Sequence, residues 1–486
     1  MITRISFLLF LSLTTHVAYG GEYLDALNAA IKKADPNGKY NGSLYHYSTA
    51  NALPRGWLEH TPKAWGKRPE EVVPFAHSEF FADHIREVIS GAEQSVDLST
   101  LYPEPDGYFA GSIEAGLKAL AKKGKPITVR ILLGNTPAGN FHAVRYLEIL
   151  RNILKAEPNG KLTIYAGGQR SGAGTWNHSK IVAADGKEAI VGGHNLWPLD
   201  YLGAQPVHDV SMRVQGPAAA GAQRFLDLMW KNVCDWNGKG TWPNYSYRWK
   251  QGSDAIVQEC APALNPAGDS NPGQVQILGV ARAATGVIPE GGDIANPSDV
   301  AMLAAMDAAK KSIKLSQQDM LYRLPQIGEC TTLIPYKGWY PGYLALARAI
   351  GRGVDVQVVV TTWNAKAGNN GTKYSNCITR DEVISYLRGA IRDLRIPDGD
   401  KLLHKHFSIA TLRFGPGKEW RNGYAFANHA KMMIIDDKLF YIGSSNFYSA
   451  DLQEYGYFVE DAFAGTQLQT DYWDPLWRWS GATAKP

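Results

Sequence analysis

The chain has 486 residues, 45% of them hydrophobic, and a formal net charge of +4. A chain of this length can bury a large core, organised as two domains or two similar halves. The net charge is too small to argue for nucleic-acid binding by itself. After residue 20 the sequence contains no run of about 18 apolar residues, the length that a membrane-spanning helix needs.

Residues 1–20 have the pattern of a secretory signal peptide. Arg4 lies in a short amino-terminal region, Ile5–Leu13 is apolar, and Ala18-Tyr19-Gly20 ends in small residues suited to cleavage. The apolar segment is too short for a spanning helix, so an uncleaved anchor is the less favoured alternative. We therefore expect a secreted protein, extracellular or periplasmic.

Four cysteines fit an exported protein, in which disulfides persist. Sequential pairing, Cys234 with Cys260 and Cys330 with Cys377, is one of three possible connectivities. Each bridge would stabilise the fold by about 3–4 kcal/mol in the chain-entropy model. No cysteine–histidine spacing resembles a zinc site, and neither a metal nor another cofactor is predicted.

Beyond residue 20, the hydrophobic periodicity predicts an α/β protein. A helix is expected over 22–33, whereas 37–74 is rich in glycine, proline and aromatic residues and has no clear period. The continuous apolar stretch 127–133 is typical of a strand buried on both faces of a parallel sheet. The first half is further predicted to contain helices over 80–89, 113–122, 144–154 and 218–230 and strands over 95–101 and 161–166.

The second half repeats this order, which indicates a duplication. Its predicted helices are 301–309, 343–350 and 382–394, and its predicted strands are 312–316, 354–361 and 410–414, with a further strand at 275–278. We therefore predict two similar halves, 21–261 and 298–486, each a mixed β-sheet flanked by helices, joined by a connecting segment, 262–297. The active site is expected between the halves, near a pseudo-two-fold axis.

One five-position pattern occurs once in each half. In Asn177–Asn195 a histidine and a lysine two positions apart precede an aspartate, a pair of glycines and an asparagine. The same offsets recur in Asn428–Asn446, with serine in place of the second glycine. Chance does not repeat such a pattern with identical spacing. The candidate residues are His178, Lys180, Asp185, Gly192, Gly193 and Asn195, and His429, Lys431, Asp436, Gly443, Ser444 and Asn446.

Each copy is predicted to be a strand, a tight turn and a second strand. Residues i and i+2 of a strand point to the same side, so the histidine and lysine of each copy project together. The aspartates are most simply turn-formers, and the small pairs are expected to let the backbone approach a ligand that the asparagines face. Two imidazoles, two ammonium groups and two amides would suit a tetrahedral phosphate.

These repeats resemble the paired HKD motifs of the phospholipase D superfamily, most strongly those of secreted bacterial phospholipase D with two motifs in one chain. The similarity covers 22–480 and includes Trp176–Lys180, Pro206–Val210, Ser316–Asp319, Gly443–Phe447 and Asp474–Trp477. It implies a secreted phospholipase D that hydrolyses a phospholipid such as phosphatidylcholine to phosphatidate and the free head group. It also implies possible transfer of the phosphatidyl group to an alcohol.

The resemblance implies residue roles as well. By position His178 is the nucleophile that forms a phosphohistidine and His429 is the acid/base, although sequence symmetry alone cannot make that assignment. The family places an acidic residue against each histidine to fix its tautomer, and the matching positions downstream of the motifs are Asp209 and Glu454. The residues expected to bind phosphoryl oxygens are Lys180, Asn195, Lys431 and Asn446. The two lysines supply the positive charge, so the resemblance implies no metal.

Three alternatives are disfavoured. A phosphodiesterase acting on DNA or RNA shares the phosphate chemistry, but the chain lacks a dense basic run with interleaved aromatics. The missing membrane spans argue against a cardiolipin-synthase-like transferase, and the intact motifs argue against an inactive lipid- or host-binding module.

The expected partner is the phospholipid membrane surface, as substrate. No obligatory protein partner is predicted, and a monomer suffices because one chain carries both motifs.

Further expectations concern one extra histidine in the first motif and the stretches that would surround the site. His194 is expected to be a solvent-facing turn residue. The stretches Tyr102–Tyr108, Tyr336–Tyr343 and His404–His406 are candidates for entrance loops that would control head-group choice. The aromatic pair Trp339-Tyr340 is the candidate for contact with lipid.

Overall fold

The computed structural model describes most of the chain between residues 21 and 486. The described ranges are 21–61, 79–137, 139–172, 174–203, 205–236, 244–287, 296–323, 330, 335–367, 371–420, 423–448 and 450–486. The predicted signal peptide, 1–20, and residues 62–74 of the aperiodic segment lie outside them. Among the described helices, none combines the length and the apolar character needed to cross a membrane.

The first sheet carries the first motif. Its strands are β2 (Leu58–Thr61), β3 (Ser95–Leu101), β4 (Pro126–Gly134), β5 (Lys161–Gly172), β6 (Thr175–Trp176), β7 (Ile181–Ala184), β8 (Glu188–Gly192), β9 (Asp209–Gln215), β10 (Tyr245–Lys250) and β11 (Ile256–Gln258). Their order is β11-β10-β5-β4-β3-β7-β8-β9-β2, with β6 paired to β5. Strands β3, β4 and β5 run parallel, and β7, β8 and β9 continue the sheet antiparallel.

The second sheet carries the second motif. Its strands are β1 (Tyr45–Asn51), β12 (Val275–Arg282), β13 (Ser312–Gln317), β16 (Asp355–Val360), β19 (Phe407–Thr411), β20 (Lys431–Ile435), β21 (Leu439–Gly443) and β22 (Glu454–Glu460). Their order is β1-β12-β22-β21-β20-β13-β16-β19. Two small hairpins pair β14 (Leu321–Arg323) with β15 (Tyr336–Gly338) and β17 (Lys366–Ala367) with β18 (Thr372–Lys373).

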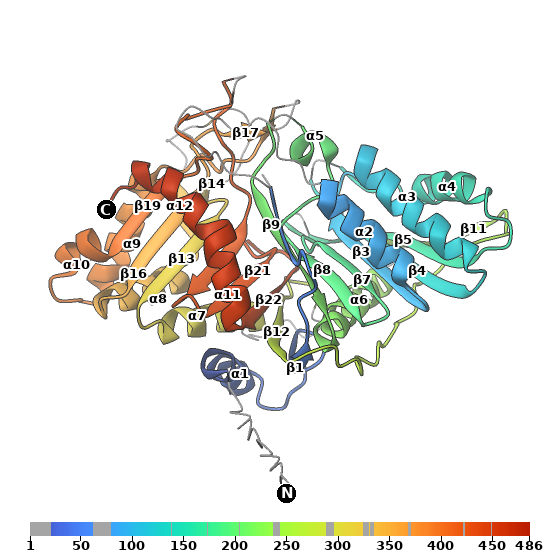
Figure 1. Cartoon of the computed structure of the whole chain (residues 1–486), viewed down its shortest axis with the longest axis horizontal. Helices are drawn as coiled ribbons and strands as arrows, with labels where there is room; N and C mark the ends of the chain where they lie inside the picture. The colour runs from blue at the N-terminus through green and yellow to red at the C-terminus, as the bar shows by residue number, and fades with distance from the viewer. Residues whose placement is uncertain are drawn as a thin grey trace, which may run out of the picture.

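Helices flank both sheets (Figure 1). They are α1 (Glu22–Ala34), α2 (Glu79–Gly91), α3 (Gly107–Lys122), α4 (Ala143–Leu154), α5 (Pro198–Tyr201), α6 (Pro217–Asp235), α7 (Pro297–Ala308), α8 (Tyr340–Gly351), α9 (Arg380–Asp393), α10 (Gly399–His406), α11 (Ala462–Leu468) and α12 (Asp474–Ser480). The single π-helical turn Gln469–Trp473 joins α11 to α12, and the 3-10 turn Gly481–Thr483 follows α12.

Strand β4 shows how the first sheet is buried on both faces. Ile131 and Leu133 pack in one cluster with α2, α3 and α4, whereas Leu132 faces a second cluster that includes α6 and the core of the second half. Successive strand residues point to opposite faces, so a strand covered on both sides needs apolar residues at consecutive positions. The predicted parallel, doubly buried strand is confirmed.

The connectivity of the two halves repeats. The succession β2-α2-β3-α3-β4-α4-β5-β7-β8-β9 is matched by β12-α7-β13-α8-β16-α9-β19-β20-β21-β22, with corresponding neighbours and strand directions. The predicted class, an α/β protein with two mixed sheets flanked by helices, is confirmed.

Strands β1 and β12 both lie in the second sheet, although the predicted domain boundaries did not assign them to the second half. Strand β12 lies in the predicted connecting segment, 262–297, yet it begins the second repeat. Strand β1 pairs with β12, Tyr45 opposite Val280, and α1 packs against α7. Residues 22–51 therefore complete the second sheet although they precede the first. Periodicity could not predict this because the partner of β1 is distant in sequence.

The stretch His404–His406 is not an entrance loop, and that prediction is wrong. It ends helix α10, at the outer edge of the second half (Figure 1). The His406 imidazole lies 2.7 Å from the carboxylate of Asp355, at the start of β16. Lys431 of the second motif pairs instead with Gln317, at the end of the parallel strand β13. The histidine-rich stretch is therefore at the opposite end of the sheet from the motif.

The other candidate entrance stretches are only partly loops. Tyr102–Tyr108 runs into α3, which Asp106 caps by accepting from the Gly107 N–H at 2.6 Å. Tyr336–Tyr343 forms β15 and the start of α8. Trp339 is half-buried and packs edge-on against Phe447, with 5.5 Å between ring centroids. Contact of Trp339-Tyr340 with lipid stays a prediction.

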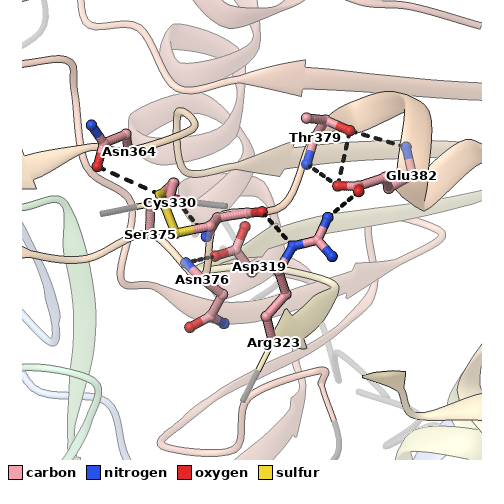
Figure 2. The surroundings of a disulfide bond; sticks show 9 residues. Asp319, Arg323, Cys330, Asn364, Ser375, Asn376, Thr379 and Glu382 are labelled. Atoms are coloured by element: carbon pink, nitrogen blue, oxygen red, sulfur yellow. Dashed lines mark hydrogen bonds and ion pairs between the residues drawn. A yellow bond between two sulfur atoms is a disulfide. The ribbon is translucent and has the colours of Figure 1, made fainter. Parts of the chain in front are cut away.

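Cys330 and Cys377 form the predicted disulfide, across a sequence separation of 47 (Figure 2). The segment around it is held further, since the Asn376 N–H donates to Asp319 at 2.7 Å and Arg323 donates to the Cys377 carbonyl at 3.0 Å.

The predicted Cys234–Cys260 disulfide is wrong for this structure. Both cysteines are free. Burial, and then a hydrogen bond with Cys260, raises the pKa of the Cys234 thiol to about 12. The two thiols are thus near each other without a disulfide between them.

Reduction of the Cys330–Cys377 bridge is expected to lower the free energy of unfolding by about 4 kcal/mol, because the unfolded chain regains the freedom of the closed loop. Denaturant unfolding with and without reductant measures this. Cys330→Ser should match the reduced protein, and Cys234→Ser is the control. A midpoint that does not respond to reductant would contradict the expectation.

Candidate active site

Both motif copies fold as the predicted hairpins. Strand β7 pairs with β8 and β20 with β21. Each turn has two consecutive residues with positive φ, Asp185 (55°) and Gly186 (64°) in the first and Asp436 (54°) and Asp437 (59°) in the second. Two positive φ angles are typical of two-residue turns whose twist matches that of the strands. The histidine and lysine lie at the other end of each hairpin.

The motif aspartates hold the segments that lead into the parallel strands. The carboxylate of Asp185 accepts hydrogen bonds at 2.7–2.8 Å from the backbone N–H groups of Glu93, Gln94 and Ser95, before and at the start of β3. Asp436 accepts at the same distances from the backbone of Lys310, Lys311 and Ser312, before and at the start of β13. Both carboxylates therefore act on the fold, at a distance from the histidines.

Asp436→Asn is expected to lower the free energy of unfolding by about 2–3 kcal/mol, since three backbone donors lose a charged acceptor. Asparagine tolerates the positive φ, so backbone strain does not contribute. Asp398→Asn, at an exposed positive-φ position (52°) whose carboxylate makes no capping hydrogen bond to α10, is the control and should cost less than about 0.5 kcal/mol. Equal losses in chemical denaturation would refute the assigned role.

Asn177 and Asn428 fix the strand ends that carry the histidines, a role the sequence analysis missed. Each donates to a serine hydroxyl near the end of a parallel strand, Ser99 at 2.8 Å and Ser316 at 3.2 Å. Each Oδ1 also accepts from the backbone N–H two positions ahead, at 3.2 and 3.0 Å. The signal was present, because both motif copies begin with asparagine directly before the histidine.

The two halves exchange short β-bridges at the motifs. Gln453, directly before β22, bridges the backbone at Asn177 and accepts from the next backbone N–H at 2.8 Å. His208, directly before β9, does the same at Asn428, with a bond of 2.7 Å. Each motif is thereby bound to the other half, and the site lies between the halves.

Because of these β-bridges, each motif histidine contacts a carboxylate that belongs to the other half. Glu454 follows Gln453, and its Oε1 lies 3.1 Å from Nδ1 of His178. Asp209 lies 2.7 Å from Nδ1 of His429. Each histidine is therefore paired with the carboxylate that follows the other motif, and both carboxylates are fully buried.

Different groups hold the two carboxylates. Asp209 accepts from the Tyr201 hydroxyl at 2.8 Å and from the backbone N–H of Val210 at 2.9 Å. Glu454 accepts from the guanidinium of Arg282 at 2.6 Å. No local pattern marks Tyr201 or Arg282, and neither was predicted.

Lys180 and Lys431 are buried close to their own histidines. The ammonium group of Lys180 donates to the backbone carbonyl of His178 at 2.7 Å, and that of Lys431 to the carbonyl of His429. Burial, and then the charge of Lys431, holds the pKa of Lys180 well below its usual value. Burial lowers the pKa of Lys431 to about 8, against the opposing effect of the two carboxylates. An anion bound here would gain from both charges.

The surroundings of both motif histidines favour the neutral imidazole. Burial, and then the two motif lysines, holds the pKa of His178 and of His429 well below the usual value. A neutral imidazole hydrogen-bonded to a carboxylate carries its proton on that nitrogen. With Nδ1 facing the carboxylate, Nε2 then has a free lone pair.

Asn195 and Asn446, at the ends of the two hairpins, are 1% and 2% exposed. Within the described part of the chain, Oδ1 of Asn195 and both amide atoms of Asn446 have no hydrogen-bond partner. Buried polar groups without partners are costly. The Nδ2–H of Asn446 is therefore suited to donate to a phosphoryl oxygen, whereas the two Oδ1 atoms can only accept a hydrogen bond.

Protein contacts require the small motif residues, and their expected approach to a ligand stays a prediction. A Cβ on Gly192 would lie 2.3 Å from the backbone of β9, and one on Gly193 would lie 2.0 Å from Oδ1 of Asp209. A Cβ on Gly443 would lie 2.6 Å from Cα of Gly456. Gly193 thus makes room for the carboxylate that serves the second motif.

Ser444, in place of the second glycine, ties the end of the second hairpin to β22. Its backbone N–H donates to the carbonyl of Tyr455 at 3.0 Å, and its hydroxyl accepts from the backbone of Tyr455 at 3.1 Å.

His194 is buried, so the prediction of a solvent-facing residue is wrong. One ring nitrogen lies 2.8 Å from the hydroxyl of Ser211 and the other 2.9 Å from that of Thr61. The chain turns inward beneath β2 and β9, whose hydroxyl groups satisfy both ring nitrogens.

Tyr374 forms part of the wall beside the second histidine. Its ring lies edge-on to His429, with 5.1 Å between centroids, and its hydroxyl donates to the buried Asp200 at 2.6 Å. The Cys330–Cys377 disulfide anchors the chain three residues further on. Sequence reasoning missed Tyr374 because it belongs to no motif.

The structure brings together His178, His429, Lys180, Lys431, Asp209 and Glu454, whereas Asn195 and Asn446 lie buried at the ends of the two hairpins. Such a set can attack phosphorus, move protons and hold anionic oxygens. Within the described residues, no group of three or more histidine, cysteine, aspartate or glutamate side chains is arranged to hold a metal ion.

Comparison with known proteins agrees with this chemistry. The chain is 30% identical to phospholipase D from Streptomyces antibioticus over 511 aligned positions, which cover 95% of this chain and 88% of the relative. The chain belongs to the phospholipase D family. Residues 302–462 match the model described as cardiolipin synthase, phospholipase D-like domain. This phospholipase D-family protein is therefore an enzyme of phosphodiester chemistry.

A solved structure shares the fold over nearly the whole length. Phosphatidylserine synthase from Haemophilus influenzae Rd KW20 superposes with a TM-score of 0.52, over 92% of this chain and 89% of that chain. At 12% identity, this likeness concerns the phospholipase D fold alone.

Proposed function

We propose that this protein is a secreted phospholipase D. It hydrolyses the distal phosphodiester of glycerophospholipids of the phosphatidylcholine type to phosphatidate and the head-group alcohol. The observation that carries the proposal is the crossed arrangement, in which two neutral imidazoles each have a carboxylate on Nδ1 and lie beside two buried lysines. One imidazole can then act as nucleophile while the other moves protons.

In the first step, Nε2 of His178 attacks phosphorus and the bond to the head-group oxygen breaks. His429, protonated once the phosphodiester anion is bound, gives its proton to that oxygen. Asp209 stabilises the imidazolium before this transfer. The phosphoryl oxygens are held by Lys180, Asn195, Lys431 and Asn446.

In the second step, neutral His429 takes a proton from water as the water oxygen attacks phosphorus. The bond between phosphorus and His178 breaks, and phosphatidate leaves. An alcohol in place of water gives a new phosphatidyl ester by the same route, so the enzyme is also a transphosphatidylase. The lysines supply the positive charge, and the reaction as proposed uses no metal or other cofactor.

The substrate surface is a phospholipid membrane, and no protein partner is needed because one chain carries both motifs. A monomer is therefore sufficient. Secretion to an extracellular or periplasmic compartment is supported by the leader-like residues 1–20 and by the Cys330–Cys377 disulfide.

The value of kcat/KM is expected to fall on the alkaline side as Lys431, with a pKa of about 8, loses the proton that lets it bind a phosphate anion. On the acid side activity should persist below pH 6.5, because the depressed pKa of His178 keeps this nucleophile unprotonated. A pH profile with a soluble short-chain phospholipid measures both limbs. Lys431→Arg, which stays charged, should remove the contribution of Lys431 and leave the alkaline limb to Lys180, whose pKa is also lowered by burial. A fall centred near pH 6.5 with a flat alkaline side would contradict this assignment.

The proposed function is tested by choline release from phosphatidylcholine vesicles in EDTA, with ethanol as a competing acceptor. EDTA-resistant release together with phosphatidylethanol, both lost in His178→Ala, is the expected result. If no choline is released and single-stranded DNA is cleaved under the same conditions, the protein is a nuclease of the superfamily. If vesicles are bound and nothing is cleaved, it is a binding module. Either outcome overturns the proposal.

A further inference from the structure

The two histidine–carboxylate pairs differ in what lies behind the carboxylate. Behind Asp209 are two neutral donors, the Tyr201 hydroxyl and a backbone N–H. Behind Glu454 is a cation, since Nη1 of Arg282 lies 2.6 Å from Oε2. The motifs are alike in sequence, yet their paired carboxylates are held by different groups.

Arg282 is itself fixed in place. It ends strand β12, is 7% exposed, and donates from Nε to Asp299 at 3.1 Å as well as from Nη2. A continuous chain of contacts therefore runs from Asp299, on α7, through Arg282 and Glu454 to His178. Burial opposes the charge of Arg282, but Asp299 and Glu454 outweigh burial and raise its pKa.

We infer that Arg282 is the positioning residue that keeps Glu454 ionised and oriented behind His178, so that Nε2 of this imidazole stays unprotonated and able to attack phosphorus. The inference rests on the proposed role of His178 as nucleophile. The guanidinium of Arg282 bonds to Glu454 and Asp299, so this residue acts on His178 through the carboxylate of Glu454.

The physical reason is the cost of an uncompensated buried charge. Burial raises the pKa of Glu454, and the Arg282 guanidinium is the strongest opposing influence. Without it, the Glu454–His178 pair should take up one proton near neutral pH. If that proton is on Glu454, the carboxyl donates to Nδ1 and the imidazole proton moves to Nε2. If it is on His178, an imidazolium forms. In both cases Nε2 carries hydrogen and cannot attack.

Other charges decide where that proton goes. Facing His178 are Glu454, Lys180, Lys431, Asp209, His429 and the backbone of Ser444. Facing Glu454 are His178, Arg282, Lys180, Lys431, Tyr441, Tyr448 and the hydroxyl of Ser445, and Arg282 also faces Asp299 and Tyr441. Since both lysines remain and repel a proton on the imidazole, we expect it on Glu454, with the Nε2–H tautomer of His178.

Arg282→Gln tests the inference. At pH 7, kcat should fall at least tenfold with KM changed less than threefold, and activity should recover as the pH rises, because the acid limb moves up by at least one pH unit. Arg282→Lys should restore part of the loss. Arg213→Gln is the matched control, because Arg213 is similarly buried and paired with two glutamates, Glu188 and Glu87, away from the histidines. It should shift neither limb.

A second readout needs no substrate. Nitrogen-15 NMR of labelled histidines, with His178 assigned through His178→Gln, should show the Nδ1–H tautomer in the wild type at pH 7 and the Nε2–H form or imidazolium in Arg282→Gln. That change would support the inference even if no phospholipid were cleaved, so failure of the proposed substrate remains distinguishable from failure of the role of Arg282.

Two results would overturn the inference. One is a loss of kcat in Arg282→Gln that is equal at every pH and parallels a lower Tm, with an unchanged His178 spectrum, because Arg282 would then be merely structural. If Arg282→Gln does not fold, Asp299→Asn, which removes the carboxylate that holds Arg282 in place, is used instead, and a wild-type pH profile in that variant is the other contradicting result.

Discussion

His178→Ala and His429→Ala are each expected to abolish detectable turnover of phosphatidylcholine, a loss of about a thousandfold or more. In the proposed mechanism His178 supplies the attacking nitrogen. His429 supplies the proton for the leaving oxygen and later takes one from water. Both side chains end in the site, so truncation should leave the fold intact.

An activated substrate should separate the two variants. With a p-nitrophenyl phosphodiester, whose leaving group needs no proton, His429→Ala should release about one equivalent of p-nitrophenol in a burst and then stall, because nothing activates water. His178→Ala should give no burst. His404→Ala, exposed on α10 at the opposite end of the sheet, is the control and should behave as wild type. A folded His178 or His429 variant that keeps more than a tenth of wild-type activity would remove that residue from the mechanism.

Asp209→Asn and Glu454→Gln are expected to give the second-largest losses, about a hundredfold to ten-thousandfold, because an amide favours the wrong imidazole tautomer. The crossed pairing predicts which step each one impairs. Asp209→Asn should slow protonation of the leaving group through His429, so an activated leaving group should restore its burst. Glu454→Gln should slow the attack by His178, and the same substrate should not rescue it.

The reverse pattern would contradict the crossed pairing. If the p-nitrophenyl substrate rescued Glu454→Gln and not Asp209→Asn, each carboxylate would be serving the histidine of its own half. Tyr201→Phe provides a graded control, since it removes one of the hydrogen bonds to Asp209 and keeps the carboxylate. It should resemble a weak form of Asp209→Asn.

Local spacing was sufficient to predict the two hairpins, because turn chemistry and strand alternation act over a few residues. The histidine and lysine of each copy are two positions apart and adjoin the same strand, so their proximity follows from the sequence. The structural role of Asp185 and Asp436 was also predictable in kind. Their three backbone partners were not, because those lie at the start of another strand.

The pairing of each histidine with a distant carboxylate could not be predicted from local sequence patterns. Glu454 is 276 residues from His178, and Asp209 is 220 residues from His429. The crossing depends on the β-bridges between halves, which leave no periodic signal. Arg282 lies in a segment predicted to be a connector. His194 was misjudged because one of its hydroxyl partners, Thr61, is 133 residues away on an edge strand.

The most direct test of the account is to locate the covalent intermediate. His429→Ala is mixed with a p-nitrophenyl ester of a short-chain phosphatidate, quenched under alkaline denaturing conditions that preserve phosphohistidine, and digested for mass spectrometry. The account predicts one phosphatidyl group on the peptide that contains His178 and none in His178→Ala. An unmodified His178 peptide, or a phosphatidyl group on another residue, would contradict it.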